Sequence, residues 1–197
     1  MAEVATKCCA RARHAASALA LLIAACASLP PVTGTRSYEG RFSLFVSAVD
    51  RHETATGRFE LTVDGPKMTL DLSTPLGTTV ARVQSGPAGA RLTVPSSAGL
   101  RTEEGSDPET LSLRVLGWTL PASGLADWIE GRPSPGRPYR LDSDENGASG
   151  LEQDGWTIRF ERRSADGSIG RIDMTRAQQG GAPAVSLRVV LDSQAGS

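Results

Sequence analysis

From Tyr38 onwards, apolar and polar residues alternate with a period of two through most of the sequence. Successive side chains of a β-strand point to opposite faces, so each such segment predicts a strand with one apolar face. An antiparallel sheet of this kind must bury its apolar face, either by curling on itself or by being covered. The predicted strands lie at 42–48, 58–64, 68–72, 90–94, 139–141, 156–160, 172–174 and 185–191.

Short turn sequences separate many of these segments. They are DGP at 64–66, GPAG at 86–89 and DGS at 166–168. Glycine tolerates the positive φ that tight turns require, and such short connections join antiparallel neighbours. The connections are too short for the crossovers of a parallel sheet. The sequence therefore predicts a mainly β, antiparallel domain over residues 38–192.

The middle of the chain interrupts this pattern with two short helices. Asp107 is a typical N-cap, Pro108 suits the first helical position, and Gly117 suits the end. A second helix is expected over Ala122–Glu130, with Gly131 as its stop. Apolar residues at helical spacing are Leu111, Val115 and Trp118, with Leu113 and Leu116 beside them, and then Leu125, Trp128 and Ile129.

Two amphipathic helices in mid-chain are suited to lie across the open end of a curled sheet. Side chains can fill the interior of such a sheet, which gives a stable small barrel, or leave an apolar cavity. The inward candidates are mostly medium-sized aliphatic residues, which are compatible with both outcomes. Periodicity alone leaves this choice open.

The first residues differ from the rest and predict a secretory signal at 1–25. A basic start with Lys7, Arg11 and Arg13 precedes a short apolar run at 15–25. That run is shorter than the roughly 20 apolar residues of a spanning helix. A buried helix at the start of a domain is the competing interpretation, but nothing caps or flanks the run as such a helix.

The signal ends in Ile23-Ala24-Ala25-Cys26, which resembles the bacterial lipobox. Its cysteine thiol is a natural acceptor for a diacylglyceryl group, and two or more acyl chains anchor a protein stably. Cys8 and Cys9 fall within the signal, so the processed chain has no disulfide pair. We expect lipidation of Cys26, a tether over 26–37 and a polar tail at 193–197. Ala27 favours sorting to the outer membrane.

The residues supply no catalytic or metal-binding constellation. A formal net charge of −1 gives no footprint for nucleic acid. His52 is the one histidine after the signal and is interpreted as a solvated turn residue, without the converging partners that a metal site or a catalytic triad needs. Acidic pairs at 103–104 and 144–145 are assigned to solvated loops. We therefore expect a protein that is not an enzyme and has no cofactor.

An ordered set of short motifs carries a family resemblance. They are GRFSL at 40–44, GRFEL at 57–61, LSTPLGTT at 72–79, ARV at 81–83, LGWTLP at 116–121, LADWIEGRP at 125–133 and QDGW at 153–156. Together with the lipobox, this order resembles the LolB family of outer-membrane lipoprotein receptors. The second strand lacks a tryptophan often found in relatives, and the chain ends in the polar sequence DSQAGS. These departures concern the cavity lining.

The resemblance implies an incomplete antiparallel β-barrel with a helical lid over an apolar cavity. It further implies that a soluble periplasmic carrier, LolA-like, delivers lipoproteins, whose acyl chains enter the cavity before insertion into the outer membrane, without nucleotide or metal. Leu76 matches an exposed leucine that is functionally important in the family. The residues alone favour a single surface leucine there, since exposed leucines are common.

The resulting hypothesis is a monomeric outer-membrane lipoprotein that faces the periplasm, is anchored through Cys26 and inserts Leu76 into lipid. Two alternatives remain: a lipoprotein that shuttles lipid or glycolipid, and a scaffold for an envelope complex, which should have a filled barrel. The candidate cavity and lid residues are Phe42, Leu44, Phe59, Leu61, Leu70, Leu111, Val115, Leu116, Leu125, Trp128 and Ile129.

Overall fold

The computed structural model describes residues 34–145 and 147–192. The predicted signal, Cys26, most of the predicted tether and the tail at 193–197 lie outside the described residues. Within the described part, no helix is long and apolar enough to cross a membrane.

Eleven strands form one sheet in the described part of the chain. The sheet order is β6-β5-β4-β3-β2-β1-β11-β10-β9-β8-β7, and every neighbouring pair is antiparallel. The prediction of a mainly β, antiparallel fold is confirmed. The strands are β1 (Arg36–Ser47), β2 (His52–Asp64), β3 (Lys67–Ser73), β4 (Thr79–Gly86), β5 (Gly89–Ser96), β6 (Gly99–Gly105), β7 (Tyr139–Asp144), β8 (Gly147–Gln153), β9 (Trp156–Arg162), β10 (Ile169–Arg176) and β11 (Ala184–Leu191).

Three of these strands, β4, β6 and β8, were not predicted from alternation. The sequence of β6 contains one large apolar residue, Leu100, and β8 is rich in small residues. Two local interpretations are also wrong. His52 begins β2 and stacks on Phe45, with ring centroids 5.9 Å apart. The acidic pair at 103–104 lies on β6, where pairing with β5 holds an otherwise polar segment extended.

Both predicted helices are present and lie consecutively between β6 and β7. Helix α1 (Pro108–Leu116) begins after Asp107, whose carboxylate accepts a hydrogen bond from the Thr110 amide at 2.8 Å. It ends at Gly117, which has a φ of 80° that glycine adopts readily. Helix α2 (Ala122–Trp128) follows after five residues. We refer to residues 108–128 as the lid.

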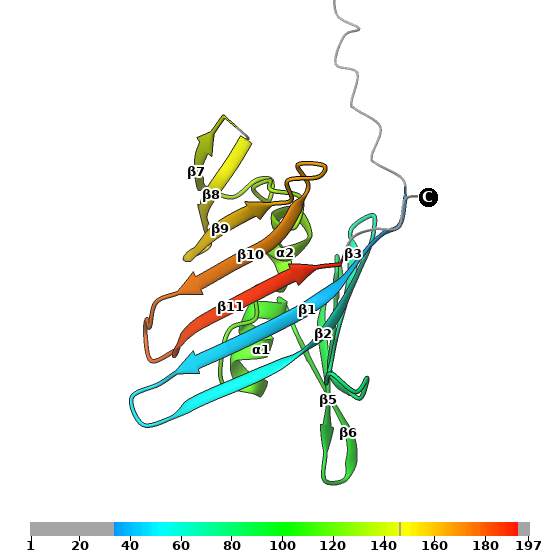
Figure 1. Ribbon diagram of the computed structural model, residues 1–197. Coiled ribbons are helices and arrows are strands. Elements are labelled where there is room, and N and C mark those ends of the chain that lie inside the picture. Colours follow the sequence, from blue (N-terminus) through cyan, green and yellow to red (C-terminus); the bar gives the residue numbers. More distant parts are fainter. Residues whose placement is uncertain (1–33, 146, 193–197) are drawn as a thin grey trace, which may run out of the picture. The chain divides into compact units, whose positions relative to one another are not determined.

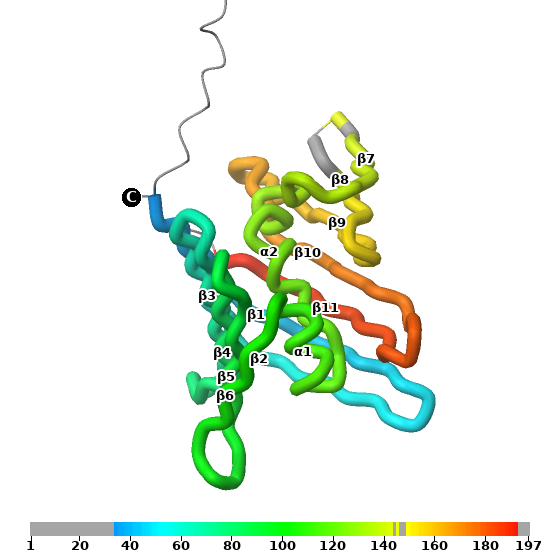
Figure 2. The backbone as a smooth tube through the Cα atoms, turned by 180° about the vertical axis from the view of Figure 1, so that it is seen from behind, coloured from blue at the N-terminus to red at the C-terminus, as the bar shows by residue number. Residues whose placement is uncertain are grey.

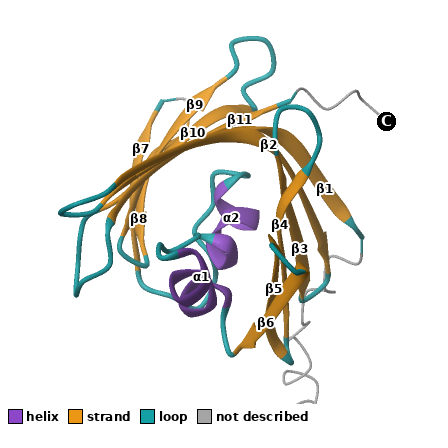
Figure 3. Cartoon of the chain, turned by 90° about the horizontal axis from the view of Figure 1, so that it is seen from below, coloured by secondary structure: helices purple, strands orange, loops and turns teal. Residues whose placement is uncertain are grey.

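The sheet is strongly curved and its two edge strands, β6 and β7, do not pair with each other (Figure 1). Seen along its end, the sheet wraps around the lid, and both helices lie in its concavity (Figure 3). The view from behind shows α1 and α2 crossing the concave side between β3–β6 and β9–β10 (Figure 2). The expected half-barrel with a helical cover is therefore the observed architecture.

The core follows the predicted alternation. In β2, the inward residues from Gly57 to Val63 are buried and the residues between them are mostly exposed. The paired strands β1 and β11 repeat this pattern with Leu44, Val46, Val185, Leu187 and Val189. The buried lid residues Leu111, Leu125 and Trp128 join the same core. The concave face of the sheet and the lid thus bury apolar side chains against each other.

Candidate functional site

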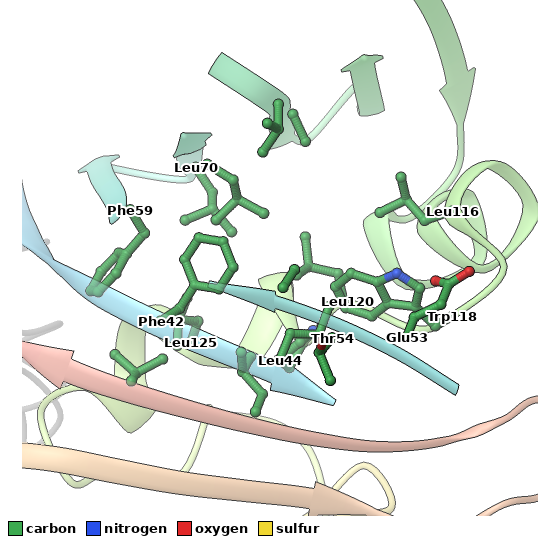
Figure 4. A pocket seen from close by; sticks show the side chains of 17 residues that line it. Phe42, Leu44, Glu53, Thr54, Phe59, Leu70, Leu116, Trp118, Leu120 and Leu125 are labelled. Atoms are coloured by element: carbon green, nitrogen blue, oxygen red, sulfur yellow. The ribbon is translucent and has the colours of Figure 1, made fainter. Parts of the chain in front are cut away.

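An apolar cavity of about 410 Å³ remains between the concave face of the sheet and the lid. Figure 4 shows it from close by, with side chains converging from both sides. Its lining residues are Phe42, Leu44, Glu53, Thr54, Ala55, Phe59, Leu70, Leu72, Val80, Ala81, Leu116, Trp118, Leu120, Pro121, Leu125, Leu187 and Val189. The choice between a filled and a hollow interior, which the sequence left open, is settled in favour of a cavity.

Two strands place aromatic rings in the cavity wall by pairing each ring with a glycine. In the β1–β2 register, Phe42 lies opposite Gly57 and Phe59 lies opposite Gly40. A Cβ on Gly57 would lie 2.8 Å from the Phe42 ring, and one on Gly40 would lie 2.8 Å from the Phe59 ring. Each ring therefore packs against a glycine of the neighbouring strand, where a side chain would leave no room for it, and this pairing favours the observed register.

These glycines explain the repeated Gly-Arg-Phe sequence of the two strands. The two copies run antiparallel, so each phenylalanine meets the glycine of the other copy, and Arg41 pairs with Arg58. The glycines point to the same inward face as the phenylalanines, because their spacing along each strand is two residues. The motif thus places both phenylalanine rings in the wall of the cavity.

The cavity opens near one end of the sheet. Among the lining residues, Thr54, Ala55 and Val80 are exposed, whereas Phe59 and Ala81 are buried. Ala55 lies near the start of β2, and Val80 near the start of β4. Figure 4 places Glu53 beside Trp118 and Leu116, away from Phe59 and Leu70. We call this exposed rim the mouth and the region of Phe59 the inner end.

The Arg51 side chain lies between the mouth and the lid. Arg51 Nε lies 3.1 Å from Glu53 Oε1. The other side of the Arg51 guanidinium lies against the end of α1, since a Cβ on Gly117 would be 3.2 Å from its Nη2. A cation at a helix C-terminus is favoured by the helix dipole. The β1–β2 turn and the end of α1 thereby lie in contact beside the mouth.

Hydrogen bonds fix the connection between the two lid helices. The buried hydroxyl of Ser112 donates to the Glu109 carbonyl and accepts from the Leu120 amide, both at 2.9 Å. The Glu109 carboxylate accepts from the amide and hydroxyl of Ser123, both at 2.8 Å. These contacts hold the segment that carries Trp118 and Leu120 into the cavity.

The buried side chain of Gln153, at the end of β8, fastens the second half of the lid. Its Oε1 accepts from the Trp128 indole at 2.9 Å and from the Ser134 amide at 2.8 Å. Its Nε2 donates to the Ser134 carbonyl at 2.9 Å. This single amide therefore attaches α2 and the segment after it to the far half of the sheet. Sequence reasoning did not single out Gln153, although it lies in the QDGW motif.

A charged cluster lies at the other end of β1, away from the mouth. The Glu130 carboxylate accepts hydrogen bonds from Arg36 and from the Tyr38 hydroxyl, and it also pairs with Arg132. Burial, followed by the hydrogen bond to Glu130, raises the pKa of Tyr38 to about 12. This cluster fastens the start of β1 to the residues that follow α2.

The structure places six of the candidate cavity residues in the lining: Phe42, Leu44, Phe59, Leu70, Leu116 and Leu125. Leu61, Leu111 and Trp128 are buried in the core outside the lining. Val115 packs partly buried against the core, and Ile129 lines a separate, more polar pocket of about 410 Å³ beside Tyr38 and Glu130. Leu76 lies in the β3–β4 turn and is 95% exposed.

Several lining residues were not among the candidates. Leu120 and Pro121 come from the segment between the helices, where no periodicity indicates which side chains point inward. Trp118 was placed at helical spacing with Leu111 and Val115, but it follows the end of α1 and lines the cavity from there. Leu187 and Val189 follow the predicted alternation of 185–191 and could have been included from it. Ala81 could have been found in the same way from its spacing to Val83.

The chemistry of the lining favours an apolar ligand. Glu53 is the one ionisable residue among the described lining residues, and it lies at the mouth. No group of three or more potential metal ligands occurs among residues 34–145 and 147–192. Such a lining offers water few hydrogen-bond partners and gains from accepting hydrocarbon.

Comparison with known proteins decides the family. The model of the family described as "Outer membrane lipoprotein LolB" matches residues 36–193, which include the whole sheet and the lid. The chain belongs to the LolB family. This membership confirms the resemblance, and LolB proteins are outer-membrane lipoproteins rather than enzymes.

LolB relatives match the chain over most of their length. The outer-membrane lipoprotein LolB of Cupriavidus pinatubonensis is 36% identical over 191 residues, covering 88% of this chain and 90% of the relative. That of Ralstonia nicotianae is 37% identical, with 87% and 90% covered. That of Bordetella pertussis is 36% identical, with 76% and 77% covered.

Among solved structures, a LolA superfamily protein from Nitrosomonas europaea aligns with a TM-score of 0.43 at 11% identity, covering 84% of this chain and 86% of that one. A TM-score of this size does not establish a shared fold.

Proposed function

We propose that this protein receives lipoproteins from a soluble, LolA-like periplasmic carrier, holds their acyl chains in the apolar cavity and inserts them into the outer membrane. The observation that supports this most is the unfilled cavity of about 410 Å³ with a nearly uniform apolar lining. Its volume falls within the range of ligand-binding pockets, about 300–1,000 Å³. Family membership and the lipobox support the location at the outer membrane.

Acyl chains can be accepted and released here without an external energy source. Each methylene that leaves water for an apolar environment contributes about 0.8 kcal/mol. The cavity provides this gain reversibly, because hydrocarbon contacts involve no covalent or charged partner. A bilayer surrounds the whole acyl chain, whereas the cavity opens to solvent at its mouth, so onward transfer to the membrane is favourable.

The proposal assigns distinct tasks to two residues outside the cavity. Cys26 carries the lipid anchor that keeps the protein at the membrane, and it lies outside the described residues. Leu76, fully exposed on the β3–β4 turn, enters the bilayer and orients the domain. Inserting one leucine contributes roughly 1.5–3 kcal/mol, enough to orient a protein already held at the surface. We propose that the protein acts as a monomer.

The decisive experiment is a handover of cargo between two soluble proteins. Residues 34–192 contain their own hydrophobic core, so a form starting after Cys26 can be used. A carrier loaded with a lipoprotein is mixed with this form without nucleotide, and the two are separated. We expect the lipoprotein with the new partner. If the lipoprotein stays on the carrier while free lipid or glycolipid enters the cavity, a lipid shuttle is the better description.

A further inference from the structure

The β1–β2, β3–β4 and β5–β6 hairpins all turn at the same end of the sheet. Strands β1 to β6 are neighbours in sequence order and antiparallel, so alternate turns fall at the same end. The β1–β2, β3–β4 and β5–β6 turns share one end, and the β2–β3 and β4–β5 turns share the other. Figure 1 shows the first three turns along the lower side of the molecule. We call this lower side the tip end.

Each of these three hairpins exposes one large aliphatic side chain. Val49 is 90% exposed in the β1–β2 turn, Leu76 is 95% exposed in the β3–β4 turn, and Leu100 is 77% exposed beside the β5–β6 turn. No other large hydrophobic residue of the described chain is more than 57% exposed. At the opposite end, the turns carry Gly65 and Pro66 and then Pro87 and Ala88. The three most exposed aliphatic residues of the described chain therefore all lie at the tip end.

Charges at the tip end are nearly balanced. Arg51, next to the β1–β2 turn, pairs with Glu53, and Arg101, next to Leu100, pairs with Glu103 at 2.9 Å. The β3–β4 turn from Thr74 to Thr78 has no charged residue. Asp50, next to Val49, adds one negative charge, so the tip end offers aliphatic groups with little net field to attract an acidic or basic partner.

The mouth of the cavity faces the same end. Its exposed rim residues Thr54 and Ala55 lie two and three residues after the start of β2, close to the turn that carries Val49. The third, Val80, lies four residues after Leu76. A chain that leaves the cavity through the mouth therefore emerges between these two hairpins.

We propose that the tip end is the membrane-docking surface and that Val49 and Leu100 enter the bilayer together with Leu76. This inference rests on the proposed function, which already assigns Leu76 to the membrane. A protein partner buries a contiguous apolar centre, but these three side chains lie on separate turns. A bilayer accepts isolated aliphatic groups wherever they meet it. Docking at three points would place the mouth directly over the hydrocarbon, so that acyl chains pass from cavity to bilayer along a short path.

The test measures the depth of single positions. Cysteine is introduced at Val49, Leu76 or Leu100, and Ala88 in the β4–β5 turn serves as the matched exposed control. An environment-sensitive fluorophore is attached to the introduced cysteine. Each full-length, membrane-anchored variant is then incorporated into phosphatidylcholine vesicles whose acyl chains bear nitroxide quenchers. We expect quenching at 49, 76 and 100 and none at 88. Adding anionic lipid should change this little, because the tip end is nearly neutral.

A functional measurement accompanies the depth measurement. Val49→Ser and Leu100→Ser should each slow insertion of cargo into vesicles by about tenfold, since each removes one aliphatic group from lipid, and uptake from the carrier should be unchanged. Quenching at 76 alone, or equal quenching at 88, would overturn the three-point surface. Protection of the labels at 49 and 100 by the carrier, with no quenching by vesicles, would identify a carrier surface instead. This outcome can be told apart from failure of the proposed function. If the proposed function were wrong, the carrier would keep its cargo, whichever labels were quenched.

Discussion

Replacing Gln153 with methionine should detach the second lid helix from the sheet and destabilise the domain. The Gln153 side chain is 3% exposed and satisfies the Trp128 indole, the Ser134 amide and the Ser134 carbonyl. Methionine has a similar length but cannot accept or donate these bonds. The variant therefore buries three polar groups without partners while it keeps the packing.

The magnitude follows from the cost of each unpaired group. A buried donor or acceptor without a partner costs about 1–3 kcal/mol, so three groups at the lower limit cost about 3 kcal/mol. For a domain of this size, each kcal/mol lowers the melting temperature by about 2–4 °C. We therefore expect a decrease of roughly 6–12 °C.

The assay compares thermal unfolding of Gln153→Met with that of Glu152→Met, a change at the exposed neighbour on the same strand. Hydrogen exchange should also speed up in α2 more than in α1, because α1 has its own contacts through Ser112. A melting temperature within about 2 °C of the Glu152 control would refute the reasoning. In that case the lid would depend on apolar packing alone.

Three further predictions concern separate parts of the structure. Leu76→Glu should fold with stability within about 0.5 kcal/mol of the parent and take cargo from the carrier, but insert it poorly into liposomes; a large fall in melting temperature would show that Leu76 is a core residue. Gly57→Ala places a Cβ 2.1 Å from the Ser73 carbonyl oxygen and should cost about 1–3 kcal/mol in urea unfolding, whereas Gly34→Ala, with open space, should not. The pKa of Tyr38 is raised from 10.0 to about 12, so the folded state keeps a proton that the unfolded chain loses. The free energy of unfolding should therefore fall between pH 10 and pH 12, and Tyr38→Phe should flatten that fall.

Alternation predicted the strands whose apolar face is buried under the lid, such as β2 and β11. It did not predict β6 and β8, because one is an edge strand with a charged sequence and the other contains small residues. Those strands form through pairing with β5 and β9, which is a tertiary effect. The caps of α1 were predictable because Asp107 and Gly117 act locally.

The site was predictable only in part, because a residue lines the cavity only where its position along the inward face is not covered by the lid. Phe59 and Leu61 share one face of β2, yet Phe59 lines the cavity and Leu61 is buried outside the lining. Periodicity assigns a residue to a face and does not say how far the helices extend over it. Trp128 was expected on the inner face of the lid, and its indole is instead bound by Gln153, because a buried indole N–H requires an acceptor.

The central claim is that acyl chains occupy this cavity, and quenching of Trp118 tests it most directly. Trp118 lines the cavity, whereas Trp128 and Trp156 are buried outside it. An acylated peptide with a nitroxide on its hydrocarbon chain is added to the protein and to Trp118→Phe, and its binding to each is measured separately. The account predicts strong quenching in the parent and loss of most of it in Trp118→Phe, which still binds the peptide. Equal quenching in both proteins would place the acyl chain elsewhere and contradict the account.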